Sequence, residues 1–149
     1  LGVGDMRKGY ERYARELGIM KHESGIEFVG LVPHKELPAY YVRATVVVVP
    51  STERVECFSI VAAEAQACGV PVVVSDFPGV RVTIEHGKTG SVVRPNDPEE
   101  LAKILEELLA NPQKIQNMGL AARKRAVELY DWQIIGDKLE RIYRACINV

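Results

Sequence analysis

The sequence predicts an α/β fold: a Rossmann-like open parallel sheet with flanking helices, followed by an all-helical tail. Three observations support this prediction. Short valine-rich runs such as residues 45–49 and 71–74 lack polar alternation, which is typical of strands buried on both faces of a parallel sheet. Helical patterns separate these runs, and strand–helix alternation favours right-handed βαβ units. After Pro95 only helical patterns remain.

Strands are expected where β-branched residues lie between glycine or proline signals. They cover residues 1–3, 26–32, 45–49, 71–74 and 91–93. Helices are expected between them, where apolar residues recur at helical spacing. They cover residues 7–17, 35–43, 59–68 and 80–86. The expected chain order therefore alternates strand and helix up to residue 93.

Residues 97–149 form the expected helical tail. Asp97 followed by Pro98 is a typical helix start, because Asp caps the free N–H groups and proline fits the first helical position. Asn111 begins a second helix in the same way, and Asp131 caps a third. We expect this tail to flank the sheet, so that residues 1–149 form a single domain.

The composition is that of an ordinary globular domain. The chain has 149 residues, a net charge of −1, 47% hydrophobic residues and 26% charged residues. These values exclude a disordered tail and a disulfide-rich miniprotein, and the lack of basic excess argues against a nucleic-acid partner. Cys57, Cys68 and Cys146 match no metal-binding spacing and predict free thiols in a reducing compartment. Because the chain starts at Leu1 rather than Met, we expect a piece of a longer protein.

The stretch of residues 50–71 carries the most chemical information. A buried strand ends at Pro50, a polar loop follows, and Ser59 is a suitable N-cap for the next helix. Ligands of open parallel sheets bind outside the carboxyl ends of the strands. The free N–H groups and the positive dipole end of the helix suit a phosphate there.

Two carboxylates bracket this helix start. Glu56 lies in the loop, and Glu64 lies on the helix among small or apolar residues such as Ile60 and Ala67. On that stripe, Glu64 is expected to be partly desolvated and to have a polar partner. The spacing alone is equally compatible with a solvated surface glutamate.

This pattern resembles a known family. Glu56 and Glu64 are separated by seven residues, Phe58 follows the first, and residues 65–73 read AQACGVPVV. Further matches lie at residues 28–33, 36–41, 87–93, 97–102 and 130–132. In this order they resemble the C-terminal, donor-binding domain of retaining glycosyltransferases of the two-domain GT-B fold, the large family of sugar transferases numbered four.

The resemblance implies roles for the matched positions. Glu64 would bind the ribose hydroxyls of a nucleotide diphosphate-sugar, and Glu56, at the catalytic position, would contact hydroxyls of the donor sugar. The remaining donor-binding positions are the backbone N–H groups of Ser59, Ile60 and Val61 facing the diphosphate, the backbone of Leu31 and Val32 bordering the base, and Phe58. The family needs no metal, so no cofactor is expected beyond the donor substrate.

The resemblance also implies an incomplete enzyme. The basic pair that binds phosphate and the N-terminal domain that binds the acceptor would precede residue 1, so this chain is expected to be inactive alone. The acceptor would be a sugar, a lipid-linked molecule or a polysaccharide. A cytoplasmic location is expected, with peripheral contact to a membrane as an alternative.

Departures and alternatives remain. Ser59 stands where the family has glycine, Pro78-Gly79 replaces a Gly-Gly pair, and Val82 replaces a glutamate. A nucleotide-sugar epimerase on the same fold and a non-catalytic nucleotide-binding or regulatory domain are the alternative functions. The basic run at residues 123–125 is expected to form a solvated helix face, with an anionic partner surface as the minor alternative.

Overall fold

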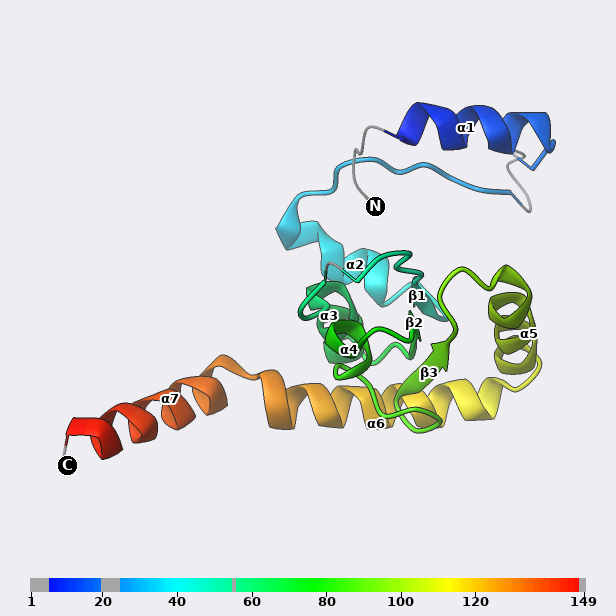
Figure 1. Ribbon diagram of the computed structural model, residues 1–149. Coiled ribbons are helices and arrows are strands. Elements are labelled where there is room, and N and C mark those ends of the chain that lie inside the picture. The colour runs from blue at the N-terminus through cyan, green and yellow to red at the C-terminus, as the bar shows by residue number, and fades with distance from the viewer. Residues whose placement is uncertain (1–5, 20–24, 55, 148–149) are drawn as a thin grey trace. The chain divides into compact units, whose positions relative to one another are not determined.

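The computed structural model describes residues 6–19, 25–54 and 56–147 (Figure 1). The chain divides into two compact units, Leu1–Leu37 and Pro38–Val149, and each unit is described by itself. The expected strand at residues 1–3 lies outside the described residues. The single domain expected over residues 1–149 stays a prediction.

The first unit contains helix α1 (Arg7–Glu16) and the short 3-10 helix η1 (His34–Glu36). The guanidinium of Arg7 donates to the backbone carbonyl of Phe28 at 2.9 Å and so ties α1 to the segment before η1. That segment was expected to be a strand over residues 26–32, and this prediction is wrong. Gly30 has a φ of +85°, which interrupts an extended backbone, and residues 26–32 adopt no strand.

The second unit contains a parallel sheet in the order β1 (Val47–Val49), β2 (Val72–Ser75) and β3 (Gly90–Val93). Val48 lies opposite Val73, and Val73 lies opposite Ser91. Every residue of the central strand β2 is buried, as expected for a valine run without polar alternation. The sequence therefore predicts these strands to within two residues.

Short helices connect the strands of the second unit. Helix α2 (Leu37–Tyr41) precedes β1, α3 (Ile60–Ala67) joins β1 to β2, and α4 (Pro78–Arg81) follows β2. Helix α4 is earlier and shorter than the expected helix at residues 80–86. It begins at proline, which fits the first turn, and it ends where the Thr83 hydroxyl donates to the Val80 carbonyl at 2.6 Å.

The tail forms helices α5 (Pro98–Leu109), α6 (Pro112–Tyr130) and α7 (Trp132–Ile147). The expected caps are confirmed by their hydrogen bonds. The side chain of Asp97 accepts from the Glu100 N–H at 2.8 Å, and the side chain of Asn111 accepts from the Lys114 N–H at 3.0 Å. Asp131 accepts from the N–H of Gln133 at 2.8 Å at the start of α7.

The core of the second unit lies between the sheet and the helices α5 and α6. Val73, Val93, Leu108 and Met118 form its buried cluster. The register places Val48, Val73 and Val93 on the same side of the sheet, because side chains alternate along a strand. The first two tail helices therefore cover this face, as a helical flank.

Helix α7 continues from the end of α6 and leads away from the strands (Figure 1). None of its described residues is buried. Trp132 at its start is 85% exposed. Within the described residues, no helix is both long and apolar enough to cross a membrane.

A close backbone crossing joins α6 to the turn between α3 and β2. Gly69 in this turn has a φ of +77°, a conformation that L side chains rarely adopt. A Cβ atom on Gly119 of α6 would overlap the carbonyl oxygen of Gly69. Both positions therefore require glycine, one for its conformation and one for the space available.

Candidate functional site

The start of α3 presents backbone N–H groups beyond the end of β1. Ser59 is buried and caps the helix, with its hydroxyl oxygen 3.4 Å from the Ala62 nitrogen. Helix geometry leaves the N–H groups of Ser59, Ile60 and Val61 without an intrahelical acceptor. Ser59 stands where the family has glycine, and its hydroxyl accepts a hydrogen bond from the N–H group of Ala62. The three other N–H groups at the helix start, which are the ones predicted to face the diphosphate, are left available.

Glu64 lies one turn further along α3 and is half-buried. The hydroxyl of Tyr41, from α2, donates to Oε2 of Glu64 at 2.9 Å. The polar partner predicted for Glu64 is thus confirmed, and the interpretation as a fully solvated surface residue is wrong. Because the Tyr41 hydroxyl belongs to a buried side chain, it holds the carboxylate in one orientation.

The environment of Tyr41 keeps its hydroxyl protonated. Burial raises the pKa of Tyr41 well above the ordinary value of a phenol, and the hydrogen bond to Glu64 and the charge of that carboxylate raise it further. The phenol is therefore a hydrogen-bond donor to Glu64 at neutral pH. Twenty-three positions separate the two residues, so the spacing of a motif does not identify this pair.

Glu56 lies in the loop before α3 and is half-buried. The hydroxyl of Ser51 donates to Oε2 of Glu56 at 3.2 Å, across the loop that follows β1. A Cβ atom on Gly79 would overlap the carbonyl oxygen of Glu56 and would lie 2.7 Å and 2.8 Å from backbone carbons of Cys57. The backbone of α4 therefore rests directly on the Glu56 loop, which explains the glycine retained in Pro78-Gly79.

Phe58 connects the same loop to the end of α6. Its ring packs edge-on against the ring of Tyr130, with centroids 5.3 Å apart and planes at 82°. This arrangement is a favourable geometry for an aromatic pair. Phe58 remains 41% exposed, so part of its ring also borders the solvent beside the helix start.

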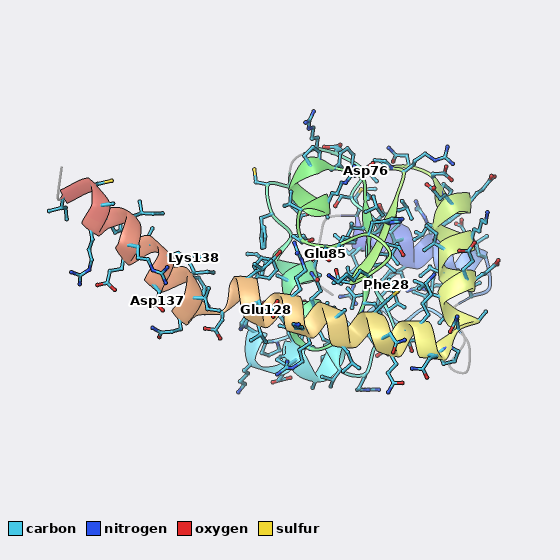
Figure 2. All side chains as sticks on the ribbon, turned by 90° about the horizontal axis from the view of Figure 1, so that it is seen from below. Phe28, Asp76, Glu85, Glu128, Asp137 and Lys138 are labelled. Atoms are coloured by element: carbon cyan, nitrogen blue, oxygen red, sulfur yellow. The ribbon has the colours of Figure 1, made fainter. Side chains whose placement is uncertain are left out.

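The basic run of α6 makes tertiary contacts. Arg123 donates to the carbonyl of Ala67, the last residue of α3, where helix carbonyls lack intrahelical partners. Arg125 donates to Glu85 at 2.9 Å and to the carbonyl of Val82 at 3.1 Å. Glu85 accordingly lies beside α6 (Figure 2). The expected solvated face is confirmed for Arg123 and Lys124, which are exposed, and is wrong for Arg125, whose side chain is only 20% exposed.

The predicted residues divide between the two units. The second unit brings together Glu56, Phe58, Ser59, Ile60, Val61 and Glu64, all within or next to α3. Leu31 and Val32 belong to the first unit, where Leu31 is exposed and Val32 is half-buried. Their predicted place beside the base stays a prediction. Among the described residues, no cluster of His, Cys, Asp and Glu is arranged to hold a metal ion.

The family follows from comparison with known proteins. The sequence profile of the family described as glycosyl transferases group 1 matches residues 1–125. This chain belongs to that family. Its fold is likewise that of a group 1 glycosyltransferase: the C-terminal domain of such a protein from Francisella tularensis superposes on 86% of the chain with a TM-score of 0.73 at 22% identity.

Two named relatives match nearly the whole of this chain. A GDP-mannose-dependent alpha-(1-6)-phosphatidylinositol monomannoside mannosyltransferase from Mycolicibacterium smegmatis is 35% identical over 95% of the chain. A D-inositol 3-phosphate glycosyltransferase from Corynebacterium aurimucosum is 36% identical over 99% of it. The chain spans 38% and 34% of the lengths of these two relatives, respectively.

Solved structures agree with this assignment. Sucrose-phosphate synthase from Thermosynechococcus elongatus superposes with a TM-score of 0.86 at 34% identity. The matched region is 97% of this chain and 35% of the synthase. HepE from Anabaena, in complex with UDP, covers 95% of the chain with 37% of its own length, at a TM-score of 0.86 and 26% identity. HepE has also been solved with UDP-glucose, with a TM-score of 0.83.

Proposed function

We propose that this chain is the nucleotide-sugar-binding part of a retaining glycosyltransferase. In the whole protein, a sugar would pass from a nucleotide diphosphate to an acceptor hydroxyl with its anomeric configuration kept. The observation that carries the proposal is the Glu64 carboxylate, held by Tyr41 at 2.9 Å one turn from the start of α3. One helical turn is about 5.4 Å, so a single nucleotide can contact both the carboxylate and the free N–H groups.

Each part of the site has a chemical task in this proposal. The two oxygens of Glu64 accept hydrogen bonds from the two ribose hydroxyls, as an ionised carboxylate can. The N–H groups of Ser59, Ile60 and Val61 bind the diphosphate at the positive end of the helix dipole. Glu56, on its loop beside the helix start, binds hydroxyls of the sugar.

Catalysis in this arrangement depends on the leaving group. When the bond between the anomeric carbon and the diphosphate breaks, negative charge accumulates on the phosphate oxygens. N–H groups fixed in advance at the start of α3 stabilise that charge more than they stabilise the bound donor, which lowers the barrier. The proposal requires no metal ion, and chelation of divalent cations is therefore expected to leave donor binding unchanged.

The identity of the base is open between at least two nucleotides. HepE, a structural neighbour at 26% identity, has been solved with UDP, whereas the mannosyltransferase relative is GDP-mannose-dependent. Both relatives belong to the same structural class as this chain, so their donors define the first molecules to test. The whole protein is proposed to be cytoplasmic, with peripheral contact to a membrane as an alternative, and to use a sugar, a lipid-linked molecule or a polysaccharide as acceptor.

The test is a binding screen by ligand-observed NMR with UDP, GDP, ADP and their sugar conjugates. Glu64→Gln keeps the side-chain size but removes the charge and one acceptor oxygen, so it should weaken binding of the preferred nucleotide about tenfold. Glu128→Gln is the matched control, because Glu128 lies on α6 and pairs only weakly with Lys124, at 3.8 Å. Equal affinity of Glu64→Gln and the unmodified chain would contradict the proposed ribose contact.

A longer protein that includes the missing length of the relatives separates the remaining outcomes. If it binds the nucleotide while this chain does not, basic residues outside residues 1–149 supply necessary phosphate contacts. If neither binds any of the nucleotides, the domain is not a donor site. Retention is tested on the longer protein by the anomeric configuration of its product.

A further inference from the structure

The backbone carbonyl of Thr83 is a meeting point of two helices. The side-chain amide of Gln66, on α3, donates to it at 2.8 Å. Arg125 Nε and the Tyr130 hydroxyl, both on α6, approach it at 3.4 Å. Thr83 is fully buried and lies just after α4, so this carbonyl fixes the α4 segment against both helices.

Gln66 is an unusual residue for its position. Its side chain is fully buried, its amide nitrogen also donates to the carbonyl of Ala62 at 3.2 Å, and its oxygen Oε1 is buried without a partner in the described structure. An unpaired buried oxygen lowers stability, and an apolar side chain of similar length would avoid this loss. What the amide provides instead is the short bond to Thr83.

The segment held by Thr83 supports the Glu56 loop through a backbone contact. The Thr83 hydroxyl binds the Val80 carbonyl within α4, and Gly79 of α4 lies against the backbone of Glu56 and Cys57. Because a backbone contact of this kind has no side chain that can rearrange, the position of α4 determines the position of the loop.

Tyr130 is a second support of the same loop. Its ring packs on Phe58, two residues after Glu56, while its hydroxyl points to Thr83. Both supports of the loop therefore meet at one carbonyl. Glu64 and the start of α3 are held separately, by Tyr41 and by the hydrogen bonds of the helix itself.

We propose that Gln66 and Tyr130 are positioning residues that act through the Thr83 carbonyl to hold Glu56 where it discriminates a sugar-bearing donor from the bare nucleotide. This inference rests on the proposed donor site. Neither side chain is assigned a contact with the donor. Their loss should therefore affect affinity for the sugar moiety and spare affinity for the nucleotide diphosphate.

The experiment compares dissociation constants of UDP with UDP-glucose, and of GDP with GDP-mannose, on the full chain and on Gln66→Met. Methionine matches glutamine in length but donates no hydrogen bond. For whichever base binds, we expect the preference for the sugar conjugate over the bare nucleotide to fall about fivefold, the effect of one hydrogen bond of ordinary strength. The dissociation constant of the bare nucleotide should change less than about twofold, well under the effect of one hydrogen bond.

Hydrogen exchange supplies a readout that needs no ligand. In Gln66→Met, the amides of residues 56–58 and 79–83 should exchange faster, whereas those of α5 should not change, because local opening is confined to the segment that loses its anchor. Tyr130→Phe is the second variant: it keeps the ring on Phe58 and removes only the hydroxyl, so it remains informative if Gln66→Met does not fold.

Arg123→Ala is the matched control. Arg123 also joins α6 to α3, through the carbonyl of Ala67, whereas the described donors to the Thr83 carbonyl are Gln66, Arg125 and Tyr130. It should lower thermal stability and leave the ratio of the two dissociation constants unchanged. Binding of nucleotide and sugar conjugate with an unaltered ratio in folded Gln66→Met and Tyr130→Phe would overturn the inference alone. Failure of the unmodified chain and of the longer protein to bind any nucleotide would overturn the proposed function and this inference with it.

Discussion

Replacement of Gly79 by alanine is a direct test of how α4 and the Glu56 loop fit together. The new Cβ atom would lie 2.7 Å and 2.8 Å from backbone carbons of Cys57 and would overlap the carbonyl of Glu56. Carbon atoms in favourable contact are about 3.5–4.0 Å apart. Relief of the overlap therefore requires the two backbones to separate by about 1 Å, measured against that contact distance.

Two opposing effects set the magnitude. Overpacking of a well-packed site costs about 1–3 kcal/mol, whereas replacement of a helical glycine by alanine gains at most about 1 kcal/mol. The overpacking term is larger because the clash involves backbone atoms that cannot rotate away. We expect a net loss of about 1–2 kcal/mol, which corresponds to a fall in Tm of roughly 3–8 °C for a chain of this size.

The assay is thermal unfolding followed by circular dichroism, with Gly136→Ala as the matched control. Gly136 lies within α7, and a Cβ atom there would meet nothing within 4 Å, so this variant should be as stable as the unmodified chain or more so. An unchanged Tm for Gly79→Ala would refute the close approach of α4 to the loop. An equal fall in both variants would show that the effect is not specific to that contact.

Three further predictions follow from the same structure. Tyr41→Phe removes the donor to Glu64 and should lower stability by about 1 kcal/mol and weaken nucleotide binding several-fold, measured by thermal unfolding and by NMR titration. The hydrogen bond from Lys88 and the charges of Lys88 and Arg125 lower the pKa of Glu85 in the folded protein. These ion pairs therefore stabilise the fold fully above the unfolded pKa of about 4.3. Their contribution is lost as the pH falls through the lower folded pKa. Glu85→Gln should accordingly lower the Tm at pH 7 and have no effect at pH 2, measured over a series of buffers. Burial raises the pKa of the Cys68 thiol, so iodoacetamide at pH 8 should alkylate the exposed Cys57 before Cys68, as peptide mass spectrometry would detect; equal rates would contradict this.

Local signals predicted the helix starts well. Asp97, Asn111 and Asp131 each bind an N–H group close to them in sequence, so the cap is specified entirely by neighbouring residues. The three strands of the sheet were also predicted, because short valine-rich runs without polar alternation are typical of strands buried on both faces.

The strand expected at residues 26–32 failed for a reason that composition does not reveal. The residues have the right preferences, but a strand exists only with a partner, and Gly30 adopts a positive φ that an extended chain does not use. β-Propensity describes the residues of one segment, whereas a strand forms only when that segment pairs with a second one.

The candidate site was predicted only in part, because the sequence shows which residues are neighbours in the chain but not which distant residues meet. The carboxylates and the helix start lie close together in the chain, so their motif was visible. The partner of Glu64 comes from α2, and the bond from Gln66 to Thr83 joins residues 17 positions apart. Within the sequence Gln66 resembles any polar residue of a helix, and its complete burial was unforeseen.

The crossing of Gly119 over Gly69 restricts how α6 can move. A shift of α6 by one residue, which combines a rise of about 1.5 Å with a rotation of about 100°, would bring the Cβ atom of Met118 or Leu120 to the Gly69 carbonyl, a place that only glycine accommodates. The crossing therefore fixes the register of α6 against the end of α3.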